Sequence, residues 1–137
     1  MSRTLSMVFD LLPGTRAGVG RTSTKTLIAN RPDGAAGGQG LGFNGAEFFA
    51  AALGGCFRND LHYAAEARGI QLHEVQVEVK VTLDGQPLRI VAAWLGAYTA
   101  SDDPEGGRSC FEDACAASII ANSVSAAFPV RFGHYEA

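Results

Sequence analysis

The chain has 137 residues, of which 47% are hydrophobic and 18% charged, a balance typical of one globular domain with its own core. The formal net charge of −3 and the absence of a basic run argue against a nucleic-acid surface. No apolar run approaches the roughly 20 residues of a membrane-spanning helix, and no signal-like segment opens the chain. We therefore expect a single domain over residues 1–137, located in the cytoplasm and without membrane partners.

The three cysteines do not form the pattern of a disulfide framework. Cys110 and Cys115 lie five positions apart with no Cys-x-x-Cys motif, and the histidines are scattered. Because metal centres need clustered ligands, we expect no metal site.

The N-terminal third is predicted to be strands followed by a long loop. Residues 4–9 suggest a first strand, and the threonine-rich stretch 21–29 suggests a second. Residues 30–44 are rich in glycine and form a loop long enough to be functional.

A long helix is predicted over residues 46–68. Asn44 is a good N-cap, and Glu47 stands three positions later, which is the spacing of a capping box. Gly69 follows as the expected C-terminal glycine. Within the helix, the pair Gly54-Gly55 costs about 1 kcal/mol per residue relative to alanine, so we expect another backbone to pass close by.

The rest of the chain, after residue 69, is predicted to form three strands and one helix. The expected elements are an alternating valine strand over 75–83, a paired antiparallel strand over 88–100, an exposed acidic turn over 101–107, an apolar helix over 111–122 and a short strand over 129–132. This order predicts an α+β domain with antiparallel sheet and two apolar helices.

Two segments then carry a family likeness. Residues 47–56 read EFFAAALGGC, which resembles the P-x-E-L-L-L-A-A-L-G-x-C segment of the family of osmotically inducible protein C and organic hydroperoxide resistance protein. Asn122-Ser123-Val124 and Pro129-Val130 resemble the closing N-S-L and P-V pattern of the same family. The likeness extends over almost the whole chain.

This resemblance implies the OsmC-like fold, with antiparallel sheets around two central apolar helices in an intertwined homodimer. It also implies a thiol-dependent peroxidase of oxidative stress defence, acting on organic hydroperoxides or hydrogen peroxide at the subunit interface. Such chemistry needs no bound cofactor, but it needs an external thiol or dithiol reductant.

The resemblance places Cys56 at the position of the peroxide-attacking cysteine. A cation must support its thiolate, and Arg21 is the best match for the family's arginine, with Arg31 second. Glu47 lies nine positions before Cys56, whereas the hydroperoxide resistance branch places its glutamate ten before, at Ala46 here. Glu47 would act only across a dimer, and its capping box explains it equally well.

The sequence departs from the family pattern at the resolving cysteine, because the family's position falls on Ser118. Cys115 lies nearly one helical turn earlier and is the candidate substitute. Asp60 and Tyr63 lie one and two turns beyond Cys56, where they line a pocket or simply pack. Two hypotheses therefore stand: a peroxidase, or a fold without efficient turnover that binds an apolar molecule at the dimer interface.

Overall fold

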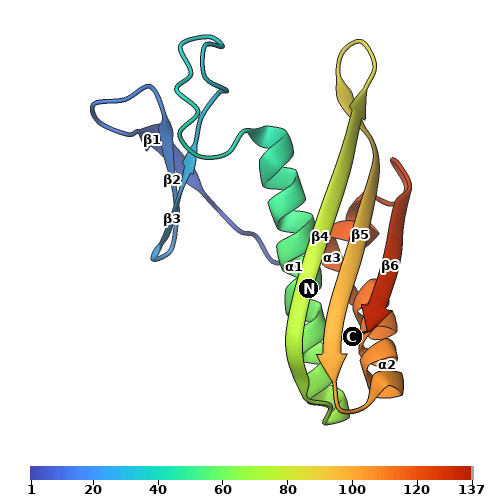
Figure 1. Cartoon of the computed structure of the whole chain (residues 1–137). Coiled ribbons are helices and arrows are strands. Elements are labelled where there is room, and N and C mark those ends of the chain that lie inside the picture. The colour runs from blue at the N-terminus through green and yellow to red at the C-terminus, as the bar shows by residue number, and fades with distance from the viewer. Residues whose placement is uncertain (137) are drawn as a thin grey trace. The chain divides into compact units, whose positions relative to one another are not determined.

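The computed structural model describes residues 1–136, which fall into two compact units, residues 1–48 and residues 49–136. The predicted α+β class is confirmed, because each unit carries a three-stranded sheet and the chain also forms α-helices (Figure 1). No helix within residues 1–136 has the length and apolarity needed to cross a membrane.

The N-terminal unit holds the strands β1 (Val8–Leu11), β2 (Gly18–Thr22) and β3 (Lys25–Ala29), all antiparallel and in the order β1-β2-β3. The single strand predicted over 21–29 is wrong. The chain reverses direction after Thr22, where Ser23 has a φ of 52°, and Thr22 pairs with Lys25. Threonine-rich alternation did not reveal this two-residue turn, because Ser and Thr serve in strands and turns alike.

The glycine-rich loop after β3 folds back onto that strand. Phe43 N–H donates to the Ile28 carbonyl, and Asn30 N–H donates to the Phe43 carbonyl, both at 3.0 Å. Gly42 allows this close approach, since it has a φ of +93° and a Cβ there would overlap the Ile28 carbonyl. The loop is therefore tied to the sheet.

Helix α1 (Gly45–Arg68) has the predicted ends. Asn44 N–H donates to Glu47 Oε1 and Glu47 N–H donates to Asn44 Oδ1, each at 3.0 Å, which confirms the capping box. At the other end Gly69 adopts a φ of +67°, and Ile70 N–H donates to the Ala65 carbonyl.

The second sheet consists of β4 (Leu72–Asp84), β5 (Arg89–Ser101) and β6 (Val130–Glu136), in that order. The predicted β4–β5 hairpin is confirmed, but β6 pairs with β5 in parallel, with Leu95 opposite Phe132. The expectation of purely antiparallel sheet is therefore wrong at this pair. The helices between β5 and β6 supply the crossover that a parallel pair requires.

One stripe of α1 packs against the inner face of this second sheet. Leu53, Phe57 and Leu61 are fully buried in a core that also contains Leu95 and Phe111. Gly54 sits on this buried side, where a Cβ would overlap Cγ2 of Val79. The close approach expected at Gly54 thus comes from a side chain and not from another backbone.

Helices α2 (Pro104–Ala117) and α3 (Ile119–Val124) replace the single helix predicted over 111–122. The predicted exposed turn over 101–107 is also wrong in part, because Asp103 caps α2, accepting from Gly106 N–H at 3.0 Å. The break between the helices lies at Ser118, whose ψ of 111° is not helical.

Candidate functional site

Cys56 lies at the border of the buried stripe of α1 and is half-buried. Its thiol donates to the Asp60 carboxylate, with 3.7 Å between Sγ and Oδ2. Burial raises the pKa of Asp60 above its usual range, and the hydrogen bond from Cys56 acts in the opposite direction with smaller effect. Asp60 therefore holds a proton more readily than a surface aspartate, beside the thiol that the sequence singled out.

Both candidate arginines belong to the N-terminal unit, whereas Cys56 belongs to the C-terminal one. Arg21 on β2 forms an ion pair with Asp10 at 3.8 Å, and 55% of its side chain is exposed. Arg31 Nη2 donates to the Arg16 carbonyl at 2.6 Å. The role of either guanidinium toward Cys56 stays a prediction.

Glu47 is exposed in the first turn of α1, and its Oε1 accepts the capping bond from Asn44. This bond, together with the negative charge at the helix N-terminus, stabilises the start of α1 and gives Glu47 a structural role. A catalytic role for Glu47 stays a prediction.

Cys115 lies in the last turn of α2 and packs against the hydrophobic core. Burial is the main cause that raises the pKa of the Cys115 thiol to about 11. At neutral pH this group is almost entirely protonated, so as it stands it is a weak nucleophile toward an oxidised Cys56. All three cysteines, including the fully buried Cys110, are free thiols.

Ser118, at the position expected for a resolving cysteine, is completely buried between α2 and α3. Its Oγ accepts from Ala121 N–H at 3.3 Å, while its own N–H donates to the Ala114 carbonyl at 3.0 Å. Ser118 therefore caps α3. Its backbone N–H closes the end of α2 and its side chain caps the start of α3, which accounts for a hydroxyl at this position without redox chemistry.

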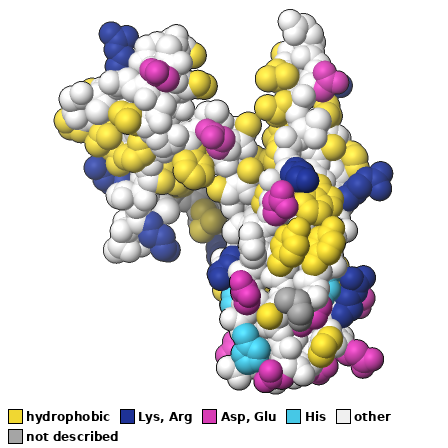
Figure 2. All heavy atoms as spheres, viewed as in Figure 1, with side chains coloured by type: hydrophobic (Ala, Val, Ile, Leu, Met, Phe, Trp, Pro, Cys, Tyr) yellow, Lys and Arg dark blue, Asp and Glu magenta, His cyan; other side chains and the backbone are white. Residues whose placement is uncertain are grey.

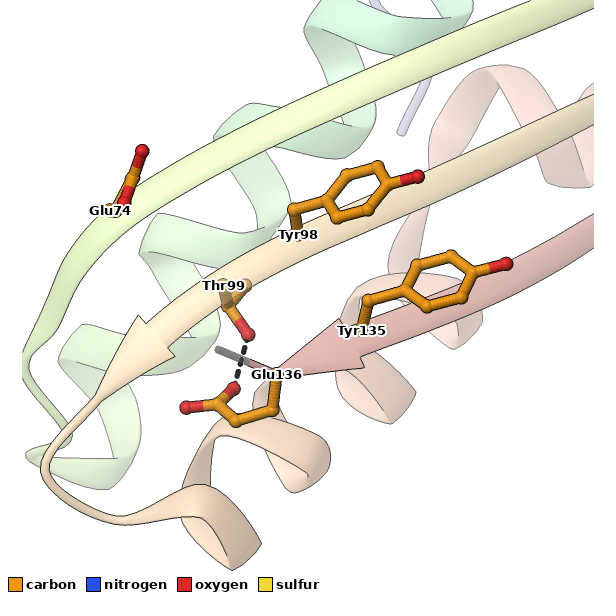
Figure 3. A pocket seen from close by; sticks show the side chains of 5 residues that line it. All are labelled: Glu74, Tyr98, Thr99, Tyr135 and Glu136. Carbon is orange, nitrogen blue, oxygen red and sulfur yellow. Dashed lines mark hydrogen bonds between the residues drawn. The ribbon is translucent and has the colours of Figure 1, made fainter.

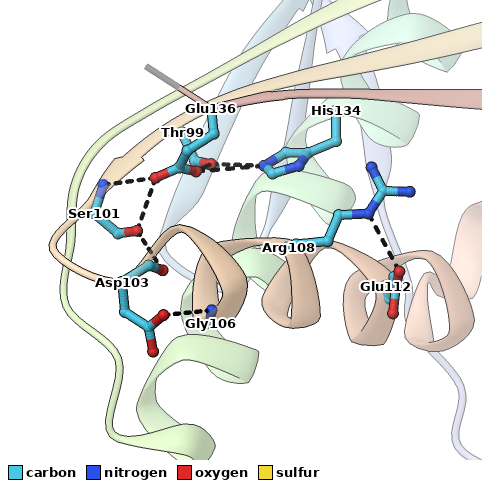
Figure 4. Close-up of polar contacts among 8 residues, drawn as sticks. All are labelled: Thr99, Ser101, Asp103, Gly106, Arg108, Glu112, His134 and Glu136. Atoms are coloured by element: carbon cyan, nitrogen blue, oxygen red, sulfur yellow. Dashed lines mark hydrogen bonds and ion pairs between the residues drawn. The ribbon is translucent and has the colours of Figure 1, made fainter.

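A polar cluster that the sequence analysis missed joins the ends of β5 and β6 (Figure 4). Thr99 Oγ1 donates to Glu136 Oε2 at 2.5 Å and lies 2.7 Å from His134 Nε2. Ser101 donates to Glu136 Oε1 through its N–H at 3.0 Å and its hydroxyl at 2.8 Å. We call these four residues the Thr99 cluster. In the sequence, this cluster is indicated only by the spacing of His134 and Glu136, which lie two positions apart and therefore share one face of β6.

Electrostatics in the Thr99 cluster favour a neutral histidine beside a charged glutamate. Burial lowers the pKa of His134, against the opposing effect of Glu136. For Glu136, burial acts to raise the pKa, but the hydrogen bonds from Thr99 and Ser101 outweigh it and hold the pKa below its usual range. Both carboxylate oxygens of Glu136 accept hydrogen bonds from residues of β5, so this side chain links β6 to β5 and is not available as a free base.

A cavity of about 230 Å³ opens beside this cluster, lined by Glu74, Tyr98, Thr99, Tyr135 and Glu136 (Figure 3). The rings of Tyr98 and Tyr135 stack with centroids 4.8 Å apart. Figure 2 shows hydrophobic side chains on the face of the β4–β5–β6 sheet turned to the viewer, with a Lys or Arg and an Asp or Glu among them and further Lys and Arg at the margin. Within residues 1–136, no group of His, Cys, Asp and Glu is arranged to hold a metal ion.

Comparison with known proteins assigns the family. A family model described as OsmC-like protein matches residues 37–132, and the chain therefore belongs to the OsmC-like family. The predicted resemblance to the osmotically inducible and hydroperoxide resistance proteins is thereby confirmed. A search of the curated proteins found no match.

Solved structures share the fold over nearly their whole length. An OsmC-like protein from Mycoplasma pneumoniae superposes with a TM-score of 0.79 at 12% identity, covering 100% of this chain and 98% of that one. An organic hydroperoxide resistance protein OsmC from Legionella pneumophila gives 0.74 at 20% identity, covering 97% of each chain. One from Elizabethkingia anophelis, with thiocyanate bound, gives 0.74 at 18%, covering 100% and 99%. Identities this low establish the fold alone.

Proposed function

We propose that this protein is a thiol-dependent peroxidase that reduces organic hydroperoxides or hydrogen peroxide through Cys56. The observation that carries the proposal is the half-buried Cys56 thiol hydrogen-bonded to Asp60, on the helix that carries the family's cysteine segment. Family membership and the hydroperoxide resistance proteins among the structural neighbours support the general kind of activity.

The proposed reaction begins with Asp60 accepting the thiol proton as the Cys56 sulfur attacks the terminal oxygen of the hydroperoxide. The O–O bond breaks, the sulfur becomes a sulfenic acid, and the alkoxide takes the proton held by Asp60 to leave as an alcohol. An external dithiol then attacks the sulfenic sulfur and releases water. Its second thiol displaces Cys56, so that the dithiol ends as a disulfide and the Cys56 thiol is restored.

Arg21 enters this proposal as the cation that stabilises the Cys56 thiolate, with Arg31 as the alternative, and Glu47 enters it as a residue of a second copy that assists across a dimer. Cys115 is proposed as an internal resolving thiol only if oxidation moves it out of its partly buried, protonated state. The external dithiol is the simpler route, because it needs no rearrangement of α2. The three free thiols fit a reducing compartment, and we propose the cytoplasm.

We also propose a homodimer, because apolar surface is left uncovered in the single chain. The edge strand β1 exposes Val8, Phe9 and Leu11, and such a strand is a ready site for pairing. On α1, Gly55 is exposed and a Cβ there would meet nothing within 4 Å. A helix glycine with no contact in its own chain supports close packing by a second copy. Light scattering at micromolar concentration tests this, and a monomeric mass would exclude it.

A second function has its own support. Ser118 caps a helix, and Cys115 is a partly buried thiol whose raised pKa keeps it protonated at neutral pH, so neither position offers a ready resolving thiolate. This favours the alternative that the fold binds an apolar small molecule at a dimer interface without efficient turnover.

Treatment with cumene hydroperoxide separates the two functions. A peroxidase loses the Cys56 thiol within minutes, dimedone labels Cys56 as a sulfenic acid, and Cys56→Ser abolishes peroxide consumption in the presence of a dithiol. Cys110→Ser serves as the matched control and retains consumption. A free-thiol count that stays unchanged under peroxide would eliminate the peroxidase and leave the binding function.

A further inference from the structure

The face of the β4–β5–β6 sheet opposite to α1 carries an exposed pair of tyrosines. Tyr98 of β5 and Tyr135 of β6 are register partners on neighbouring strands, and their rings stack with 17° between their planes. The two residues are 39% and 49% exposed. Because large aromatic side chains carry much of the energy of molecular contacts, a stacked pair left this open indicates a surface that contacts another molecule.

The cavity of about 230 Å³ beside the Thr99 cluster is lined by these two tyrosines (Figure 3). Glu74 of β4 also lines it. Glu74 lies on the same outer face as the rings, because it stands two positions from Gln76, the register partner of Tyr98. The cavity is smaller than the roughly 300–1,000 Å³ of sites for drug-sized ligands, so its ligand is small.

The charged groups that line this cavity are both acidic. Glu74 is exposed and is in no ion pair with another residue of 1–136. Glu136 is the second, and hydrogen bonds from Thr99 and Ser101 keep its pKa below the usual range. His134 Nε2 lies 3.6 Å from Glu136, but burial lowers the pKa of His134, so a neutral histidine leaves the charge of Glu136 unbalanced at pH 7. A cationic ligand would balance this charge.

The two carboxylates act on the cavity in different ways. Glu136 alternates with Tyr135 along β6, so its carboxylate lies toward the inner side of the sheet and acts on a ligand mainly through its charge. Its oxygens and the hydroxyl of Thr99 are already engaged in hydrogen bonds. Glu74 shares the outer face with the rings and is the carboxylate that a ligand meets directly. A cation that needs few hydrogen bonds therefore fits this cavity best.

We propose that this cavity binds a small organic cation of the quaternary ammonium class. The methyl groups of the cation pack against the rings of Tyr98 and Tyr135, which also attract its charge, and the charge lies beside Glu74. A quaternary ammonium has no N–H group to satisfy, which suits a cavity whose other acceptors are engaged. This site is separate from the proposed chemistry of Cys56. Coverage of the tyrosine pair by a second copy of the chain is the competing outcome.

Titration of choline into the full-length protein, followed by proton NMR and calorimetry, tests this proposal. Saturation of the tyrosine ring protons should transfer to the N-methyl protons of choline, because the two groups are in contact. Neutral 3,3-dimethylbutan-1-ol, in which carbon replaces the charged nitrogen, should bind at least about tenfold more weakly. Tyr98→Leu and Glu74→Gln should each weaken choline binding about three- to fivefold, the effect of losing one partly exposed cation–π or ionic contact.

Two controls keep the outcome specific. Glu78→Gln should leave the affinity unchanged, because Glu78 lies on the same face of β4 but outside the cavity, next to Lys80. Cys56→Ser should bind choline as the wild type does, even if the peroxidase proposal fails. If Tyr98→Leu does not fold, Glu74→Gln and the comparison of choline with the neutral alcohol decide.

Several results would overturn the proposal. Equal binding of choline and the alcohol would show that the cavity does not recognise charge. A loss in Glu78→Gln as large as that in Glu74→Gln would show that only the general charge of the surface matters. Tyrosine signals that respond to protein concentration and not to choline would show that a second copy covers this face.

Discussion

Cys56 donates its thiol hydrogen to a carboxylate one helical turn away, at 3.7 Å from Asp60 Oδ2. A carboxylate that accepts the thiol proton assists attack of the sulfur on a peroxide. We therefore predict that Asp60→Asn slows peroxide consumption by about 10²-fold, a usual loss for a general base, because an amide does not take up the proton.

Peroxide consumption is measured with a dithiol present, and peptide mapping of iodoacetamide labelling on the same samples checks that Cys56 is intact and accessible. Asp33→Asn is the matched control, because this exposed aspartate lies in the loop of the other unit. An Asp60→Asn variant that consumes peroxide as fast as the wild type would contradict the proton-acceptor role and leave Asp60 as a packing residue.

The adjacent glycines of α1 should respond in opposite ways to alanine. Gly54→Ala places a Cβ against Val79, and overpacking of this kind costs about 1–3 kcal/mol of unfolding free energy, more than the gain in helix propensity. Gly55→Ala meets open space and should stabilise the isolated chain by up to about 1 kcal/mol.

Urea unfolding and light scattering together check this pair. If a second copy packs on Gly55, its alanine variant should dissociate while its monomer stays folded. Equal destabilisation by both substitutions, with no change in mass, would show that neither the Val79 contact nor a packed copy governs this part of α1.

The features that were correctly predicted rest on local signals. The ends of α1 follow from Asn44, Glu47 and Gly69, which act within a few residues of one another, and the alternating valines identify β4 and its buried face. The errors lie in features that depend on contacts between residues far apart in the sequence. The direction of β6 depends on pairing with β5 through Leu95 and Phe132, and no local pattern in β6 encodes whether that pairing is parallel.

The contacts of the candidate site likewise include some that the sequence predicts and some that only the fold creates. Cys56 and its neighbour Asp60 share one helix face, so helical spacing alone brings them together. The Thr99 cluster joins residues about 35 positions apart and becomes visible only once β5 and β6 are paired. Arg21 matched the family pattern, but its contact with Asp10 depends on the register of β1 against β2.

Ser118 offers a test of the break between α2 and α3. Ser118→Ala removes the Oγ that accepts from Ala121 N–H and should cost about 1 kcal/mol, or roughly 3 °C in Tm. Ser125→Ala is the control, because Ser125 is exposed beyond α3 and its substitution should change Tm by less than about 1 °C. A Ser118→Ala variant as stable as wild type would mean that the helix break is set by backbone packing and not by the cap.

The Thr99 cluster should make stability depend on pH. Burial lowers the pKa of His134 in the fold from the ordinary 6.5, with Arg108 acting in the same direction and Glu136 and Glu112 against it. Between the folded and unfolded pKa the unfolded chain binds more protons, so stability falls as pH drops below about 6.5, by at most about 1.4 kcal/mol per pH unit. Glu136, whose pKa is lowered, stabilises above 4.5 and loses this contribution as pH falls through its folded pKa.

Two successive losses on acidification are therefore expected, the first from His134 and the second from Glu136. Unfolding free energies measured by urea between pH 7 and pH 4 should fall throughout for the wild type. His134→Gln should flatten the curve between about pH 6.5 and pH 5 while keeping the later decline, because Glu136 still accepts from Thr99 and Ser101. His62→Gln, on the exposed face of α1, should leave the whole curve unchanged. If His134→Gln retains the wild-type slope near pH 6, His134 is not the group that titrates. The stability of the β5–β6 pair then does not depend on a neutral histidine at this position.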